Sequence, residues 1–367
     1  MPDRGGIDTH IQAIETSAYR IPTEHPEADG TLTWNSTTLV KVEVKTPAGQ
    51  GWGYTYADLA TAILIQETLS HVLKDYDAMA IPDCWMAMRR SIRNLGNSGM
   101  AAMAIAAVDT ALWDVKARVL EIPLVTLIGA AHSGIPVYGS GGFTSYTDAQ
   151  LEAQLESWTA QEIPQVKMKV GQNPTEDLHR VDLARKALLP NTRLFVDANG
   201  AYSIKQAWWF AERFAESGVQ WFEEPVSSDN LTGLHAIREH APPSMEIAAG
   251  EYGYDARYFQ SMLDAESVDV LQADASRCGI TGLLQVGALC ESRSMPLSAH
   301  CAPSLHLHPA CTLHSLRHIE YFHDHVRIER MLFDGFPTPV KGILYPDLSR
   351  AGHGLDLNRA DAAQFAL

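Results

Sequence analysis

Residues 193–225 read RLFVDANGAYSIKQAWWFAERFAESGVQWFEEP, and this stretch decides the fold. An apolar run at Arg193–Val196 is followed by a helix candidate at Ser203–Ser217 and by a second apolar run at Gln220–Phe222. The pattern predicts a strand–helix–strand unit, in which parallel strands are joined through a right-handed crossover. A chain that repeats this unit folds into an α/β domain with a parallel sheet.

The same unit recurs along the chain from about Ile135 onward. Eight strands alternating with helices favour a closed barrel over an open doubly wound sheet. The open sheet would need a phosphate-binding fingerprint after an early strand, and Gly139-Ser-Gly-Gly142 has neither that spacing nor a Walker lysine. No helix is predicted within the barrel after the eighth strand. The strand candidates are Pro136–Ser140, Gln165–Val170, Arg193–Val196, Gln220–Phe222, Glu246–Ala249, Val268–Gln272, Pro296–Ala299 and His318–Tyr321.

The first 130 residues show a different pattern of apolar residues. Thr37–Lys45 alternates and is rich in β-branched residues, which predicts an antiparallel strand, whereas Met100–Leu120 has apolar residues at helical spacing. We therefore expect an α+β domain over residues 1–130 and a barrel over residues 131–330. The tail, about 331–367, is rich in Gly, Pro and Asp and is expected to run back over the first domain.

Composition narrows the class of protein. Of the 367 residues, 46% are hydrophobic and 20% charged, which is enough apolar sequence for a large core. Lys+Arg number 28 and Asp+Glu 44, and the resulting net charge of −16 opposes nucleic-acid binding. No apolar run approaches the roughly 20 residues of a membrane span, and the N-terminus lacks the apolar core of a signal peptide. The five cysteines show no CxxC spacing, so we expect reduced thiols and a cytoplasmic protein.

Charged residues stand at the carboxyl ends of successive predicted strands, where parallel barrels carry their catalytic groups. Asp197, Glu223 and Glu251 lie about one strand–helix unit apart, and neighbouring carboxylates repel unless a cation joins them. Because all three offer oxygen, the set favours Mg²⁺ over zinc. The alternative, three unrelated acids that cap helix N-termini, explains one such residue better than three in register.

Six further residues complete the candidate site. Lys167 and Lys169 are two residues apart on one strand, so both point into the barrel, where a lysine with a lowered pKa can act as a base. Asp274 and His300 end adjacent strands, and a carboxylate beside an imidazole fixes its tautomer. Glu320, near the end of strand eight, could donate a hydrogen bond if protonated, or form a surface salt bridge. Arg277 could hold an anionic group or organise Asp274.

At this point the sequence resembles the enolase superfamily, specifically its mandelate racemase group, over nearly its whole length. Together the motifs are specific, although each alone is weak. They are Val166-Lys-Met-Lys-Val-Gly171, Val196-Asp-Ala-Asn199, Trp221-Phe-Glu-Glu-Pro225, Ala249-Gly-Glu251, Asp274 with His300, Ile319-Glu-Tyr321 and the helix-like stretch 104–116.

The resemblance implies a modified TIM barrel, (β/α)7β, with an N-terminal α+β capping domain. It implies one Mg²⁺ held by Asp197, Glu223 and Glu251, and it selects Glu223 over Glu224. It further implies removal of the proton beside a carboxylate to give a metal-stabilised enediolate. In that scheme Lys169 and His300 are the bases and Lys167 touches the carboxylate. The supporting roles fall to Asp274, which would orient His300, and Glu320, which would donate to the enediolate.

Two reactions remain open. One is dehydration of a sugar acid to a 2-keto-3-deoxy acid, which the resemblance favours, and the other is racemisation or epimerisation of a 2-hydroxy acid or sugar acid. Some branches of the resembling group place a lysine at the end of strand six as the second base. Here that region reads Asp274-Ala-Ser-Arg-Cys-Gly279 and contains no lysine, which argues against the muconate-cycloisomerising and dipeptide-epimerising branches. A barrel that only binds a ligand is disfavoured because the catalytic set is intact. The resemblance also implies a homo-oligomer, a dimer or octamer. Expected substrate contacts are His25, Trp34, Tyr54, Asn199 and Arg277.

Overall fold

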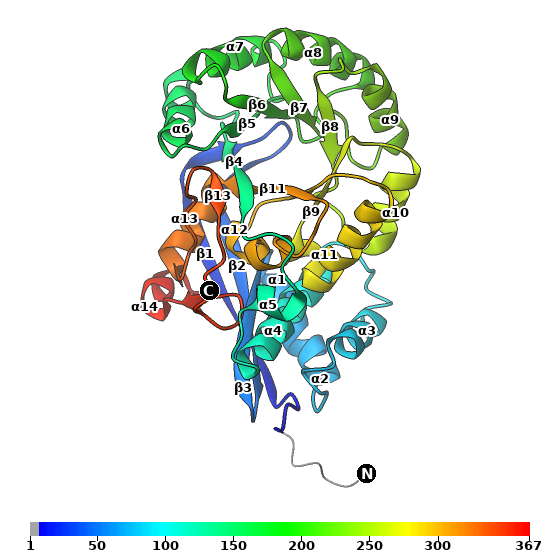
Figure 1. The fold of residues 1–367 in the computed structure, drawn as a ribbon, viewed down its shortest axis with the longest axis vertical. Helices are drawn as coiled ribbons and strands as arrows, with labels where there is room; N and C mark the ends of the chain where they lie inside the picture. The colour runs from blue at the N-terminus through cyan, green and yellow to red at the C-terminus, as the bar shows by residue number, and fades with distance from the viewer. Residues whose placement is uncertain (1–6) are drawn as a thin grey trace.

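The computed structural model describes residues 7–367, which form a parallel barrel with a smaller domain packed against one end (Figure 1). Eight parallel strands pair in sequence order, and β11 pairs with β4 to close the barrel. This confirms the predicted fold class. The strands are β4 (Ile135–Gly141), β5 (Gln165–Lys169), β6 (Arg193–Asp197), β7 (Val219–Glu223), β8 (Glu246–Ala249), β9 (Val270–Ala273), β10 (Leu297–Ala299) and β11 (Leu316–Phe322).

Seven helices connect the strands, and an eighth, α13 (His323–Leu332), follows β11. The prediction of no helix after the eighth strand is therefore wrong. Two acids of α13 are buried and hydrogen-bonded to the capping domain, Asp324 to Thr37 and Glu329 to Tyr54, so tertiary contacts stabilise a segment whose sequence looks polar. The connecting helices are α6 (Asp148–Ala160), α7 (Asp177–Ala187), α8 (Ile204–Glu216), α9 (Leu231–His240), α10 (Ala256–Asp264), α11 (Ala275–Ser292) and α12 (Pro303–Ala310).

The barrel interior has an aromatic floor beneath a charged layer. Tyr138, Phe195 and Trp221 are fully buried there, and the rings of Phe195 and Trp221 stack with centroids 5.2 Å apart. Because side chains on a strand alternate, the residue two positions on from each ring also points inward. Phe195 is followed in this way by Asp197, and Trp221 by Glu223. The floor separates the charged layer from the far end of the barrel.

The capping domain is a three-stranded antiparallel sheet covered by helices. Its long strands, β1 (Ala13–Ala28) and β2 (Thr33–Thr46), carry a hairpin up to the barrel, where Thr144 donates hydrogen bonds to backbone oxygens of Ala28 and Asp29. Within this hairpin, residues 23–28 and 33–34 are strand, and residues 29–32 form the turn. The remaining elements are β3 (Gly49–Tyr56), α1 (Leu59–Leu64), the π-helical turn Ile65–Leu69, α2 (Ser70–Val72), α3 (Ile81–Ser91), α4 (Met100–Val119) and α5 (Leu124–Ile128).

Helix α4 lies directly on β3 because two glycines let the backbones approach. A Cβ on Gly53 would lie 2.5 Å from the carbonyl oxygen of Ala107, and one on Gly51 would lie 2.3 Å from the amide nitrogen of Val115. Asp109, fully buried on α4, accepts hydrogen bonds from both the amide and the hydroxyl of Thr281 on α11. This contact joins the capping domain to the barrel.

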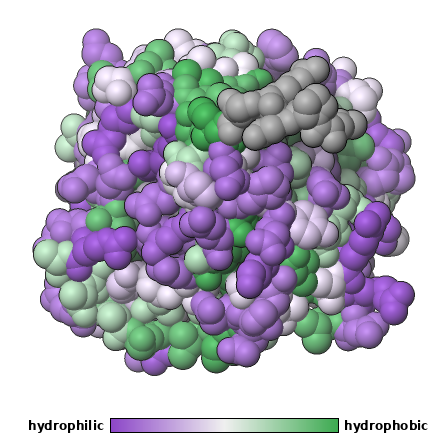
Figure 2. Space-filling view, turned by 90° about the horizontal axis from the view of Figure 1, so that it is seen from below, coloured by the Kyte–Doolittle hydropathy of each residue, from purple (hydrophilic) through white to green (hydrophobic). Residues whose placement is uncertain are grey.

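The C-terminal tail packs against both parts. It contains β12 (Phe333–Asp334), β13 (Ile343–Leu344), β14 (Asp356–Leu357), α14 (Arg359–Ala362) and a 3-10 turn (Ala363–Phe365). Strand β13 pairs with β4 of the barrel, and Leu367 donates a backbone hydrogen bond to Ala18 of the capping sheet. Hydrophilic side chains cover most of the face seen in Figure 2, with apolar groups in small patches. Within residues 7–367, no helix has the length and apolar character needed to cross a membrane.

Candidate active site

A cavity of about 440 Å³ opens where the carboxyl ends of the barrel strands meet the capping domain. Both parts contribute to its wall, which places catalytic candidates from the barrel opposite residues of the β1–β2 turn, of β2, and of the end of β3 with the two residues that follow it. The barrel contributes Lys169, Asn199, Glu251, Tyr252, Asp274, Ser276, Arg277, His300, Cys301, Glu320, Phe322 and His325, and the capping domain contributes Asp29, Leu32, Trp34, Ser36, Thr37, Thr38, Tyr56, Ala57 and Asp58.

The three predicted metal ligands lie together. Asp197, Glu223 and Glu251 are buried, and one oxygen of each falls within 4.8 Å of the others. Glu251 Oε2 has no hydrogen-bond partner among residues 7–367, and neither has Oε1 of the neighbouring buried Glu224. Burial, followed by repulsion from Asp197, raises the pKa of Glu223 to about 8. A cluster of buried, incompletely paired carboxylate oxygens fits a hard divalent cation.

The charge balance around the cavity supports the same conclusion. Six acidic side chains face three cationic ones, and burial with mutual repulsion raises the pKa of two of the acids, Glu223 and Glu224, because their ionised forms would leave a negative surplus in a buried place, where it is costly. A bound cation would offset that surplus. The carboxylates are Asp197, Glu223, Glu224, Glu251, Asp274 and Glu320, and the cations are Lys167, Lys169 and Arg277.

Both lysines point into the barrel, as the two-residue spacing predicts. Lys167 Nζ lies 2.8 Å from Glu320 Oε1 and 3.3 Å from Asp197 Oδ2, while Lys169 Nζ contacts Asp197 and lies 3.1 Å from Asn199 Oδ1. Burial would lower the pKa of Lys169, but Asp197 outweighs burial and raises it; Lys167 opposes that rise. Beside Asp197, Lys169 is therefore held as an ammonium ion, in contrast to the lowered pKa that the sequence analysis expected.

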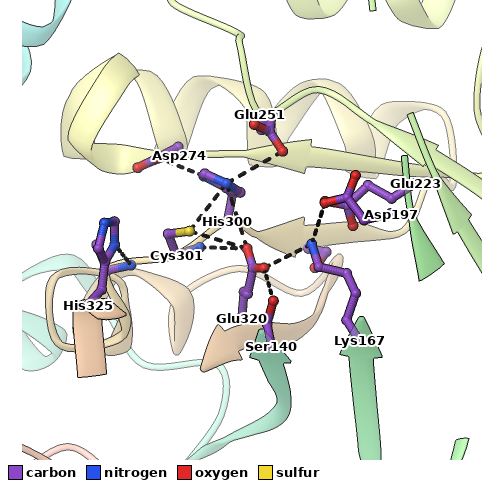
Figure 3. Close-up of polar contacts among 12 residues, drawn as sticks. Ser140, Lys167, Asp197, Glu223, Glu251, Asp274, His300, Cys301, Glu320 and His325 are labelled. Carbon is purple, nitrogen blue, oxygen red and sulfur yellow. Dashed lines mark hydrogen bonds and ion pairs between the residues drawn. The ribbon is translucent and has the colours of Figure 1, made fainter. Parts of the chain in front are cut away.

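His300 is held by the carboxylate of Asp274 at the end of β9. His300 Nδ1 lies 2.9 Å from Asp274 Oδ2, and its Nε2 lies 3.4 Å from Glu251 Oε2 (Figure 3). Asp274 also caps α11 by accepting a 2.7 Å hydrogen bond from the amide of Ser276, which fixes its second oxygen. Burial lowers the pKa of His300, but the neighbouring acids raise it overall, Glu251 and Glu320 first. The imidazole can therefore both accept and release a proton at its Nε2.

Glu320 differs from its expected state. Burial would raise its pKa, but the ammonium of Lys167 lowers it well below the usual value. Its carboxylate accepts hydrogen bonds from the hydroxyl of Ser140 at 2.5 Å and from the amide of Cys301 at 3.0 Å (Figure 3). Glu320 is thus ionised here and accepts hydrogen bonds, which corrects the expectation of a protonated donor.

The predicted substrate contacts divide into two groups. Trp34, Asn199 and Arg277 line the cavity, and Arg277 is fixed by a 2.9 Å hydrogen bond to the carbonyl oxygen of Glu251. Tyr54 does not line it, because its fully buried hydroxyl donates to Glu329 at 2.9 Å beneath α13. His25 is exposed and also lies outside the cavity wall. The expectation for Tyr54 and His25 is therefore wrong.

The sequence analysis did not single out several residues of the cavity wall as site residues. Tyr56, two positions after Tyr54, lines the cavity at the end of β3. Cys301 follows His300 directly, and its Sγ lies 3.2 Å from His300 Nε2. His325 belongs to the helix that was not predicted. Only Cys301 carried a signal in the sequence, namely its place beside a predicted catalytic histidine.

Comparison with known proteins identifies the family. Residues 13–129 match the mandelate racemase / muconate lactonizing enzyme N-terminal domain, and residues 150–362 match the enolase C-terminal domain-like family. A mandelate racemase/muconate lactonizing enzyme-like protein from Rubrobacter xylanophilus is 47% identical, with a TM-score of 0.95 over 98% of this chain and 100% of its own. The chain belongs to this family of the enolase superfamily, and it is an enzyme.

The relatives with named activities include two enzymes that act on sugar acids. A 3,6-anhydro-alpha-L-galactonate cycloisomerase from Streptomyces coelicolor is 31% identical over 358 residues, which cover 95% of this chain and 97% of the relative. The L-talarate/galactarate dehydratase from Salmonella typhimurium, solved with Mg and L-lyxarohydroxamate, is 25% identical, with a TM-score of 0.89 over 97% of this chain and 93% of its own.

Proposed function

We propose that this enzyme removes the proton beside the carboxylate of a sugar acid and expels the oxygen on the next carbon, giving a 2-keto-3-deoxy acid. Sugar-acid dehydration and isomerisation are the activities named for its relatives. The observation that carries the proposal is one cavity in which a histidine–carboxylate pair and an inward-facing lysine adjoin a cluster of three buried carboxylates.

The cofactor is Mg²⁺, which relatives of known structure contain. Asp197, Glu223 and Glu251 would hold it, since they offer clustered oxygens, one of which accepts no hydrogen bond from residues 7–367. When bound, the ion supplies positive charge against the negative charge that develops on the substrate carboxylate.

His300 moves the proton in this proposal. In its neutral form Nδ1–H donates to Asp274, so the lone pair on Nε2 faces the cavity and takes the proton from the α-carbon. The imidazolium, stabilised by Asp274, then gives that proton to the oxygen leaving the β-carbon. The C–H and C–O bonds break, a carbon–carbon double bond forms, water leaves, and the resulting enol becomes the 2-keto acid.

Lys169 faces the same cavity and supports a different outcome. It would bind the substrate carboxylate as an ammonium ion, or act as a base once Asp197 is drawn to a cation and the pKa of the lysine falls. If two bases act from different sides, the proton can return on the opposite face. That is the racemase or epimerase alternative.

Cycloisomerisation is the second candidate, favoured by the 31% identity to the anhydrogalactonate enzyme over nearly the whole chain. A 3,6-anhydro sugar acid carries an ether oxygen on the β-carbon. The same elimination would open that ring without losing water, so the residues proposed above serve either reaction.

A product assay tests the proposal. The enzyme with Mg²⁺ is incubated with a panel of aldonic, aldaric and anhydro sugar acids, and 2-keto acid is read as its semicarbazone. Loss of one water in the product mass identifies dehydration, and unchanged mass identifies cycloisomerisation. His300→Asn should give no product, whereas the control His323→Asn, whose imidazole pairs with Glu24 outside the cavity, should retain activity. Equal product from His300→Asn would overturn the assigned base.

A further inference from the structure

One imidazole in the cavity wall is held in a fixed orientation, and one of its nitrogen atoms makes no hydrogen bond with residues 7–367. His325, on α13, lies at the opposite end of the site from Asp197 and Glu223 (Figure 3). The metal-ligand cluster and His325 thus bound two ends of one cavity, with His300 and Cys301 between them. A substrate whose carboxylate is at the first end would bring its far end toward His325.

Three contacts fix the imidazole ring. It stacks on Tyr56, with centroids 3.5 Å apart and planes 13° apart, and its edge meets Phe322 at 5.1 Å. Its Nδ1 accepts a 3.2 Å hydrogen bond from the backbone amide of Ala302. The amide of Ala302 starts helix α12, in a turn where Cys301 and Ala302 both have positive φ, so the ring is tied to rigid backbone.

These contacts also assign the tautomer. A backbone N–H only donates, so Nδ1 must carry the lone pair, and a neutral imidazole then carries its proton on Nε2. Burial lowers the pKa of His325 to about 4, which keeps the ring neutral at neutral pH. Nε2–H has no hydrogen-bond partner among residues 7–367 and is not among the buried unpaired atoms, so it is accessible to solvent on a residue that lines the cavity.

We propose that His325 is a substrate-specificity residue whose Nε2–H donates a hydrogen bond to a hydroxyl or carboxylate oxygen at the end of the sugar acid remote from the metal-binding carboxylate. The inference rests on the proposed function and adds a subsite to it. It explains why a ring that takes no part in proton transfer is held so firmly at the cavity wall. It also restricts the substrate to acids long enough to reach from the carboxylate cluster to α13.

Two variants that remove different ring nitrogen atoms separate this role from a structural one. In His325→Asn the amide oxygen occupies the place of Nδ1, so the acceptor for Ala302 remains while the Nε2–H donor is lost. His325→Phe keeps the stacking on Tyr56 but loses both nitrogen atoms. His323→Asn, on the same helix but outside the cavity wall, is the matched control.

The test is calorimetric binding to the Mg²⁺-loaded enzyme, made inactive by His300→Asn so that no substrate is consumed and Lys169 still faces the substrate carboxylate. The long probes are galactarate, L-talarate, L-glucarate, L-rhamnonate and D-arabinonate, and the short probe is glycolate, which has no distal oxygen. We expect His325→Asn to weaken the tightest long acid about three- to tenfold, the range for one hydrogen bond, and to leave glycolate and thermal stability unchanged.

The outcomes are distinct. If a long acid binds equally well to the parent and to His325→Asn, or if that variant weakens glycolate as much as the long acid, the subsite is refuted while the proposed function stands. If the parent binds glycolate and the long acids with equal affinity, the subsite is again refuted. If the parent binds none of these acids in the presence of Mg²⁺, the proposed function itself fails, and the subsite falls with it.

Discussion

Asp109 should make the stability of this enzyme depend on pH in a way that a single substitution removes. The carboxyl group is fully buried between α4 and α11, and burial raises its pKa from 3.8 to about 7 despite the hydrogen bonds from Thr281. The folded state therefore holds a proton that the unfolded chain releases. For a raised acid pKa, the stabilising contribution is complete below the unfolded value and is lost as the pH rises through the folded value.

The magnitude follows from the two pKa values. Between about pH 4.5 and about pH 7.5 the Asp109 contribution to the free energy of unfolding should fall by about 3 kcal/mol, at 1.36 kcal/mol per pKa unit. Asp109→Asn is neutral at every pH and lacks this slope, although it shifts stability by a constant amount through its altered bonds to Thr281.

Urea denaturation of the wild type and of Asp109→Asn at several pH values provides the measurement. Other titrating groups contribute to both proteins, so the difference between the two isolates Asp109. We expect the wild type to lose about 3 kcal/mol relative to the variant as the pH rises across this range. A constant difference at all pH values, or a difference of opposite slope, would refute the assignment of a raised pKa to this buried carboxyl group.

Three further predictions concern the site and its surroundings. Lys169→Ala should abolish turnover and still bind Mg²⁺, because Lys169 is not an expected ligand; wild-type rates would refute its role. Glu251→Gln should weaken Mg²⁺ affinity at least tenfold by calorimetry, and unchanged affinity would remove Glu251 from the metal site. Tyr54→Phe should lower the free energy of unfolding by about 1 to 2 kcal/mol, since it removes a buried hydrogen bond to Glu329, and should leave KM unchanged. A raised KM would return Tyr54 to the substrate contacts.

The barrel and its charged layer could be predicted because both depend on local pattern. Strand–helix alternation set the parallel topology, and the two-residue period placed Lys167 and Lys169 on the inner face. The same period set the aromatic floor beneath the acids, as Phe195 below Asp197 illustrates. Residues at the ends of parallel strands meet wherever the barrel closes, so their proximity needed no knowledge of loops.

The capping contacts could not be predicted in the same way. Tyr54 and Tyr56 share a face of β3, and only the packing of α13 decides that the first is covered while the second reaches the cavity. Helix α13 itself depends on buried bonds from Asp324 and Glu329 to the capping domain, which no local pattern reveals. The protonation state of Glu320 could not be predicted from the sequence either, because its ionised form follows from its distance to Lys167.

The central claim is that the enzyme removes the proton beside a carboxylate by means of His300. Proton NMR in D₂O with Mg²⁺ tests it most directly, using the sugar acids that bind. The account predicts that the wild type either exchanges the α-proton for deuterium or forms product deuterated at the position next to the keto group. The same spectra from His300→Asn should show neither. Product formed from the wild type with no solvent deuterium at that carbon, or unimpaired exchange by the variant, would contradict the account.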